Sequence, residues 1–171
     1  MKVCILCEKP SVAASVAAVL GAKERHDGYL SGNGYLVTWA FGHLVQLAMP
    51  NAYGYTGFRR ENLPILPQAF KYINFGDAGR EGELIFRLIY NYTGCRKPFD
   101  RLWISSLTDR AIREGLDNLR PGNDYDNLYR AAEARAIADW EIGLNATQAL
   151  SIAAGQGIYS LGRVQTPTLM M

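Results

Sequence analysis

Hydrophobic and polar positions along the chain predict strands and helices that follow one another closely. Residues 2–7 are nearly all apolar and are bounded by charge, which predicts a buried strand. Pro10 suits the first turn of a helix, and the Ala- and Val-rich residues 12–20 run to Gly21, which suits a helix end. The chain is therefore predicted to begin with a strand, a short turn and a helix.

The next segments are predicted to be a hairpin, a long loop and one short strand. Residues 28–39 place apolar residues on both sides of Asn33-Gly34, a strong turn sequence, and predict a β-hairpin. Residues 50–67 are rich in Asn, Tyr, Gly and Pro and predict a surface loop. Only the short apolar run 72–75 precedes Asp77, and no helical pattern separates it from the loop. A parallel neighbour of the first strand needs a longer crossover than this.

The second half of the chain is predicted to be mainly helical. Apolar residues recur at helical spacing over 81–92. Residues 102–107 predict another strand, and Thr108 suits the N-cap of a helix that runs to about Leu119. Pro121-Gly122-Asn123 then breaks the pattern before the helical stretch 124–154.

Composition limits the classes of protein that this chain can belong to. Its 171 residues are 49% hydrophobic and 20% charged, which predicts a globular protein with a substantial core. The net charge of +2 neither indicates nor excludes a nucleic-acid partner. No apolar run approaches the roughly 20 residues that span a bilayer, and the apolar start is too short for a signal peptide, so cytoplasmic residence without a membrane partner is expected. Cys4, Cys7 and Cys95 are an odd number and lack a second metal-binding pair, so we expect structural cysteines.

Acidic residues follow two of the predicted strands. Glu8 ends the first strand and Asp77 ends the short one, and each precedes a helix. If the two strands are parallel neighbours, their carboxylates meet at one sheet edge, where they repel unless a cation such as Mg²⁺ binds. Glu81 and Glu83 lie within one helical turn and could reach the same ion. Lys9 and Arg80 add positive charge, which suits the handling of a phosphodiester.

Ordinary structural roles explain several of these residues equally well at this point. Acids at the start of a helix are common because they favour its dipole. His43 is isolated and could simply be packed or solvated. The glycine-bearing tail 155–168 suits backbone contact with phosphates, but a plain loop has the same composition.

Four motifs together resemble a known family. They are Glu8-Lys9-Pro10-Ser11, Gly42-His43-Leu44, the turn from Asp77 to Glu83, and the segment from Ser160 to Pro167, in that order. The set resembles the N-terminal part of type IA DNA topoisomerases, closest to the bacterial topoisomerase III group. The resemblance spans nearly the whole chain, and the ordered combination is far more specific than any single motif.

The resemblance implies an α/β fold in two parts. Residues 1–120 would form a Toprim domain, a Rossmann-like parallel sheet flanked by helices. Residues 121–171 would begin a helical DNA-binding domain. In the family a helix and a fuller strand precede the Asp motif, so the resemblance also implies that a segment is missing before Asp77.

The resemblance implies roles for individual residues as well. Magnesium would be bound by Glu8, Asp77 and Glu81, although Gly79 stands where the family usually has a further Asp and puts a second metal site in doubt. Lys9 and Arg163 would contact the scissile phosphate, and the implied catalytic set is Glu8, Lys9, Asp77 and Arg163. The implied DNA-binding residues are His43, Arg135, Asp139, Ser160, Leu161, Gly162, Arg163, Val164 and Gln165.

The activity implied for the whole protein is ATP-independent cleavage and rejoining of one DNA strand through a tyrosyl-phosphate. None of the tyrosines here precedes Pro-Arg-Thr, so the nucleophile is expected outside these residues and the chain alone should be inactive. Implied partners are DNA, mainly single-stranded, and by family analogy alone a helicase, in the bacterial cytoplasm at the nucleoid. The alternatives are another Mg²⁺-dependent Toprim phosphotransfer enzyme, such as a primase or nuclease, and a non-catalytic module that binds single-stranded DNA.

Overall fold

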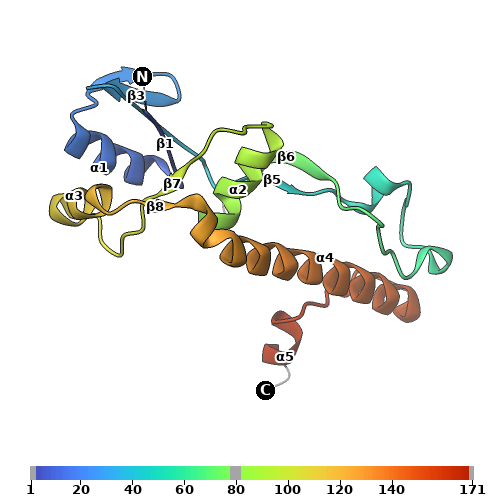
Figure 1. The fold of residues 1–171 in the computed structure, drawn as a ribbon. Helices are drawn as coiled ribbons and strands as arrows, with labels where there is room; N and C mark the ends of the chain where they lie inside the picture. The colour runs from blue at the N-terminus through green and yellow to red at the C-terminus, as the bar shows by residue number, and fades with distance from the viewer. Residues whose placement is uncertain (1–2, 78–81, 170–171) are drawn as a thin grey trace. The chain divides into compact units, whose positions relative to one another are not determined.

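The computed structural model of the chain describes residues 3–77 and 82–169 (Figure 1). These residues divide into two compact units, each described by itself below. The first unit comprises Met1–Val45 and Asn74–Tyr129, and the second comprises Gln46–Ile73 and Arg130–Met171. Each unit is thus built from two separate segments of the chain, whereas the predicted domains, 1–120 and 121–171, are each one continuous segment. The predicted boundary between them stays a prediction.

A four-stranded sheet carries the first unit. It consists of β1 (Val3–Cys7), β2 (Glu24–His26), β3 (Tyr29–Gly32) and β4 (Tyr35–Trp39), in the order β1-β4-β3-β2. β1 runs parallel to β4, with Cys7 opposite Trp39, whereas the other neighbours are antiparallel. The predicted first strand and hairpin are therefore confirmed, and the α/β class is confirmed with a mixed sheet.

Helix α1 (Pro10–Leu20) covers this sheet and forms its core. Val16 on the helix and Val37 on β4 are both fully buried, and Ile112 of helix α3 (Asp109–Asp117) joins the same cluster. α1 ends where Gly21 adopts a left-handed backbone with φ of 72°, as the sequence predicts. Full burial of such side chains contributes roughly 1.5–3 kcal/mol each, so this contact is the main support of the unit.

β1 is less buried than the sequence predicts. Val3 is 48% exposed and Cys4 is also exposed, while Cys7 is buried. Within the described residues β1 is hydrogen-bonded only to β4, which leaves its other edge open. The apolar composition of this strand predicts neighbours on both sides, and the structure supplies one.

The strand that ends at Asp77 lies elsewhere. β6 (Tyr72–Asp77) pairs with β5 (His43–Leu47) in a separate two-stranded sheet. The arrangement in which the strands of Glu8 and Asp77 are parallel neighbours is therefore wrong for the described residues. The physical reason is the one visible in the sequence: the loop that precedes β6, with the short 3-10 helices η1 (Pro50–Tyr53) and η2 (Arg60–Asn62), holds no crossover helix.

Residues 102–107 do not form the predicted strand. Only the two residues before them, β7 (Asp100–Arg101), pair with β8 (Arg120–Pro121). Leu102 and Ile104 pack against the core while Trp103 between them is 60% exposed. The alternation of packed and exposed side chains thus arises from packing alone, and residues 102–107 do not pair with a neighbouring strand.

The predicted helices of the second half are present. They are α2 (Gly82–Tyr92), α3 (Asp109–Asp117), the 3-10 helix η3 (Gly122–Tyr125), the 29-residue α4 (Asp126–Ala154) and the short α5 (Gln165–Leu169). Thr108 caps α3 as predicted, since its hydroxyl accepts a hydrogen bond from the Ala111 amide at 3.3 Å. No helix among the described residues is long and apolar enough to cross a membrane.

In the second unit, the loop 46–73 is fixed to α4 by side chains of the helix. Asn145 bonds to both backbone groups of Ile65, accepting from its amide at 2.6 Å and donating to its carbonyl at 3.0 Å. The Trp140 indole donates to the Ala48 carbonyl at 3.1 Å, and Phe70 and Tyr53 pack edge-on against its ring. The loop is therefore held by specific polar contacts as well as by its aromatic residues.

Gly32, next to the turn of the β3–β4 hairpin, lies very close to the end of α1, and a substitution can test this contact. Gly32 has φ of 148°, and a Cβ there would lie 2.8 Å from the Gly21 carbonyl oxygen and 2.9 Å from the Ala22 Cα. We expect Gly32→Ala to lower the free energy of unfolding by roughly 2–4 kcal/mol, because overpacking adds to backbone strain. Gly34→Ala is the matched control, since its φ of 82° is strained but nothing lies within 4 Å of its Cβ. Equal losses in urea unfolding would contradict this prediction.

Candidate functional site

Glu8 lies beside the start of α2. Its Oε2 atom is 3.3 Å from the position that a Cβ on Gly82 would occupy, and Gly82 is the first residue of that helix. Glu8 directly follows β1 and is half-buried, whereas the exposed Lys9 occupies the N-cap position of α1. The carboxylate thus faces the helix end that carries partial positive charge, although β6 and β1 are not paired.

The other predicted metal ligands belong, in the sequence, to the turn that precedes α2. Asp77 is the last residue of β6, but its side chain, like Gly79, Arg80 and Glu81, lies outside the described residues. The described ends, β6 at Asp77 and α2 at Gly82, leave only four residues between the strand and the helix that Glu8 touches. Carboxylate oxygens are the ligands that Mg²⁺ prefers, so the donor chemistry fits that ion. Elsewhere, among the described side chains, no group of three or more potential ligands occurs.

Glu83 cannot join such a site, which corrects the expectation that it could reach the ion. Its side chain is only 5% exposed. Its Oε1 pairs with Arg87 Nε at 3.0 Å, and its Oε2 pairs with Arg101 Nε at 2.7 Å. Both carboxylate oxygens are therefore occupied by buried cations.

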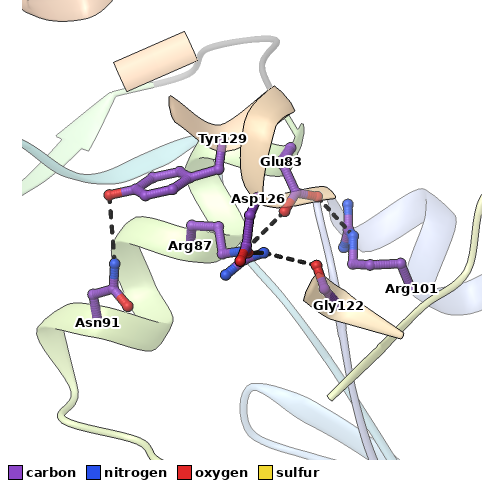
Figure 2. A network of polar contacts seen from close by, with 7 residues as sticks. All are labelled: Glu83, Arg87, Asn91, Arg101, Gly122, Asp126 and Tyr129. Carbon is purple, nitrogen blue, oxygen red and sulfur yellow. Dashed lines mark hydrogen bonds and ion pairs between the residues drawn. The ribbon is translucent and has the colours of Figure 1, made fainter. Parts of the chain in front are cut away.

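Arg87 extends this contact into a network, which we call the Arg87 network: Glu83, Arg87, Arg101, Gly122 and Asp126 (Figure 2). The Arg87 guanidinium bonds to the Gly122 carbonyl at 2.8 Å and to the Asp126 carboxylate. Its two cations and two carboxylates balance in charge. The network ties α2 to β7, η3 and the first residue of α4.

Aromatic rings complete the surroundings of the two arginines. The Arg87 guanidinium lies 4.7 Å from the centre of the Phe99 ring, and that of Arg101 lies 5.1 Å from the centre of Phe86. Burial alone lowers the pKa of Arg87, but the hydrogen bonds and charges of Glu83 and Asp126 outweigh it and raise that pKa overall. Arg87 is therefore charged at neutral pH.

Sequence reasoning missed this network. The spacing of Glu83 and Arg87, four residues apart on one helix, was its only local signal. Asp126 lies 39 residues from Arg87 in the sequence, so no local pattern predicts their contact.

In the second unit, three of the predicted DNA-binding residues come together. Arg163 makes two hydrogen bonds to the Asp139 carboxylate, and Arg135 lies 3.8 Å from the same group. The hydrogen bond from Arg163 lowers the pKa of Asp139 most, burial opposes this, and the charges of both arginines add to the lowering. Asp139 is therefore ionised at neutral pH and pairs with two cations, one on α4 and one in the segment before α5.

Hydroxyl side chains of α4 and α5 hold the segment that contains Arg163. The Thr147 hydroxyl accepts from the Leu161 amide at 2.9 Å and donates to the Leu161 carbonyl at 3.2 Å. The Ser151 hydroxyl accepts from the Tyr159 amide at 2.9 Å, and the Thr166 hydroxyl accepts from the Gly162 amide at 3.0 Å. Ser160, Arg163, Val164 and Gln165 remain exposed around these fixed points. The segment is thus an anchored loop rather than a plain one.

His43 begins β5 and is half-buried. It belongs to the first unit, whereas Arg135, Asp139 and Arg163 belong to the second. Its role stays a prediction.

Of the three cysteines, only Cys7 is buried. Burial raises the pKa of the Cys7 thiol to about 12, so it is not a thiolate ligand at neutral pH. Cys4 and Cys95 are free and exposed.

Comparison with known proteins adds family relationships to this geometry. The Toprim domain family matches residues 3–107, and a DNA topoisomerase family matches residues 123–171. The chain is 46% identical over 197 residues to DNA topoisomerase 3 of Bacillus subtilis (strain 168), a match that covers 99% of this chain and 27% of that protein. DNA topoisomerase 3 of Bacillus anthracis is 45% identical over 194 residues, with 98% and 26% covered. The chain thus spans about a quarter of the length of these relatives.

The first alignment is also longer than the chain. It extends over 197 residues whereas the chain has 171, so at least 26 aligned positions, the difference, have no residue here. That number is about one helix and one strand with their turns, which agrees in size with the segment expected to be missing before Asp77.

Loss of one partner from the Arg87 network is expected to destabilise the first unit strongly. Glu83→Gln leaves two buried cations without their carboxylate and should lower the free energy of unfolding by about 3 kcal/mol or more. Glu114→Gln is the control, because Glu114 and Arg110 form an exposed pair at 2.7 Å whose loss should cost about 0.5 kcal/mol or less. Chemical denaturation of both variants measures the difference, and similar losses would show that the buried network adds little.

The anchoring of the loop by Thr147 is testable on its own. Thr147→Val keeps the shape of the side chain but removes both hydrogen bonds to Leu161, so the Leu161 amide should exchange roughly tenfold faster with solvent. Thr147→Ser retains the hydroxyl and should leave that rate nearly unchanged. Hydrogen exchange followed by NMR gives both rates, and an unchanged rate in the valine variant would contradict the assignment.

Proposed function

Since this chain belongs to the Toprim domain family, we propose that it is part of a type IA DNA topoisomerase of the topoisomerase III group. The observation that carries the proposal is the position of the Glu8 carboxylate at the start of α2, directly after the turn that contains Asp77 and Glu81. The relatives named DNA topoisomerase 3 support the same assignment. The activity would be ATP-independent cleavage and rejoining of one DNA strand.

The reaction is a pair of phosphoryl transfers. A tyrosine hydroxyl attacks a DNA phosphate, a bond from the tyrosine oxygen to phosphorus forms, and the bond to the leaving deoxyribose oxygen breaks. Religation reverses these steps, so the energy of the phosphodiester is conserved and no ATP is needed. None of the 10 tyrosines of this chain precedes Pro-Arg-Thr, so we place the nucleophile outside these residues.

The residues of this chain would position and neutralise the scissile phosphate. Glu8, Asp77 and Glu81 would hold Mg²⁺, which supplies positive charge to the phosphate during religation. Lys9, exposed at the start of α1, would contact the same phosphate, as would Arg163. Gly79 removes one carboxylate from the turn, so we propose one metal ion rather than two.

Single-stranded DNA would lie along the surface made by the anchored loop and α4. Asp139 supports this role because it orients the guanidinium groups of Arg163 and Arg135, and such cations are suited to phosphate contact. His43 would add a further contact. We extend the proposal, by analogy with the family alone, to a helicase partner and to action at the nucleoid in the bacterial cytoplasm.

Magnesium titration tests the metal site directly. We expect calorimetric titration of the chain with MgCl₂ to show binding that Glu8→Gln and Asp77→Asn each weaken by at least about tenfold, because each removes a ligand charge. Asp117→Asn, an exposed acid at the end of α3, is the matched control and should bind as the unaltered chain does. Titrations that are indistinguishable among all four proteins would overturn the metal site, and absence of binding would favour the non-catalytic DNA-binding module.

The assignment to a topoisomerase has a separate test. The coding sequence that follows the codon for Met171 should contain a tyrosine followed by Pro-Arg-Thr or a close equivalent. A complete coding sequence without such a segment would end the topoisomerase proposal while leaving the metal site intact.

A further inference from the structure

An open cavity of about 560 Å³ lies in the first unit, in a place that none of the predicted site residues occupies. We call it the Trp103 pocket, and the lining residues that matter here are Trp103, Ser105, Glu114, Asn118, Arg120 and Tyr125. Its volume lies within the range of pockets that bind small organic ligands. It is formed between the segment after β7, helix α3 and the segment from β8 to η3.

An exposed aromatic platform forms one wall of this pocket. Trp103 is 60% exposed, and its ring stacks on Tyr125 with centroids 5.2 Å apart and planes inclined by 19°. Leu102 and Ile104 on either side of Trp103 pack against the core, which fixes the backbone beneath the ring. The indole therefore has a fixed orientation while much of its surface remains open to solvent.

The base of the pocket is tightly packed. A Cβ on Gly115 of α3 would lie 2.5 Å from Ile104 Cγ2 and 2.6 Å from Leu102 Cδ1. The helix therefore approaches the Trp103 segment as closely as a glycine permits, and the pocket cannot readily collapse.

Polar side chains of Asn118, Glu114 and Arg120 also line the pocket, beside the Trp103 ring. The Asn118 amide nitrogen donates to the Glu114 carbonyl at 2.7 Å, which leaves the Asn118 side-chain oxygen as an acceptor. The Glu114 carboxylate is held from outside by Arg110 at 2.7 Å. Arg120 is exposed and makes no ion pair with any residue that the structure describes. The pocket thus offers an aromatic face, carbonyl and carboxylate acceptors and one available cation.

We propose that the Trp103 pocket binds one nucleotide, with an amino-bearing base stacked on Trp103 and its phosphate against Arg120. Stacking suits any base, because every base has a π face. The acceptors of Glu114 and Asn118 favour cytosine, adenine or guanine, whose edges carry amino donors, over thymine, which has none. The nucleotide comes either from a DNA strand or from the free pool, and both sources present the same chemistry.

The first experiment observes the pocket directly. In a ¹⁵N NMR spectrum the indole signals of Trp39, Trp103 and Trp140 are assigned with Trp103→Phe, and dCMP is then added. We expect the Trp103 signal to shift, with an apparent Kd for dCMP at least about fivefold lower than for TMP. Inorganic phosphate is the control for charge alone. Absence of a shift at Trp103, or an equal shift with phosphate alone, would overturn the proposal.

Variants then test each part of the pocket. Trp103→Ala should weaken dCMP binding by about fivefold or more through lost stacking, and Arg120→Ala should weaken it through the lost cation. Glu114→Gln should reduce the preference for dCMP over TMP. Arg113→Ala, on an exposed position of the same helix, and Tyr92→Ala, an exposed aromatic residue elsewhere in the unit, should leave binding unchanged. If Trp103→Ala does not fold, Arg120→Ala and Glu114→Gln still test the proposal. Unaltered dCMP binding and unaltered preference over TMP in both variants would refute nucleotide binding in the Trp103 pocket.

A final comparison identifies the source of the nucleotide. Fluorescence anisotropy with labelled dC₁₂ and dT₁₂ measures strand binding, with Arg163→Ala as the background that removes the proposed contact in the second unit. Tighter binding of dC₁₂ than of dCMP, sensitive to Trp103, supports a DNA strand, and equal affinity supports a free nucleotide. The assay needs no Mg²⁺ and no cleavage, so failure of the metal-site proposal leaves this inference standing, and the reverse also holds.

Discussion

The burial of Glu83 between Arg87 and Arg101 is the constraint on which the rest of the first unit depends. A carboxylate that is 5% exposed is tolerated only because both oxygens meet cations, and those cations are tolerated because Glu83, Asp126 and a backbone carbonyl face them. The network fixes the first turn of α2 and the first residue of α4 at once. It therefore sets where α2 begins, and hence where Gly82 meets Glu8.

The Arg87 network includes only one of two glutamates that are close together in the sequence. Glu81 and Glu83 look equivalent in the sequence, since both lie in the turn and first residues of a helix. Glu83 lies on the face of α2 next to β7, where its carboxylate pairs with Arg87 and Arg101. Glu83 thus serves the structure of the first unit and is not available to the metal site that we propose.

Local elements could be predicted from the sequence because their causes are local. Gly21 ends α1, Asn33-Gly34 turns the hairpin and Thr108 caps α3, each through its own backbone or side chain. The strand expected over residues 102–107 was wrong because alternation records only which side chains face the core, not whether a neighbouring strand exists. The pairing of β6 with β5, and the contact of Arg87 with Asp126, depend on residues far apart in the sequence, and local patterns do not determine them.

The open edge of β1 and the displaced β6 have one physical explanation. A parallel strand needs a crossover of a dozen or more residues, and between β5 and β6 the chain forms only the short 3-10 helices η1 and η2. Without a crossover helix, β6 pairs with the strand that precedes its loop, which is β5. Glu8 lies beside Gly82 although β6 is not paired with β1. The reason is that the Arg87 network holds α2 through β7, η3 and α4 rather than through β6. The position of the candidate metal site therefore depends more on a buried charge network than on the sheet from which its acids emerge.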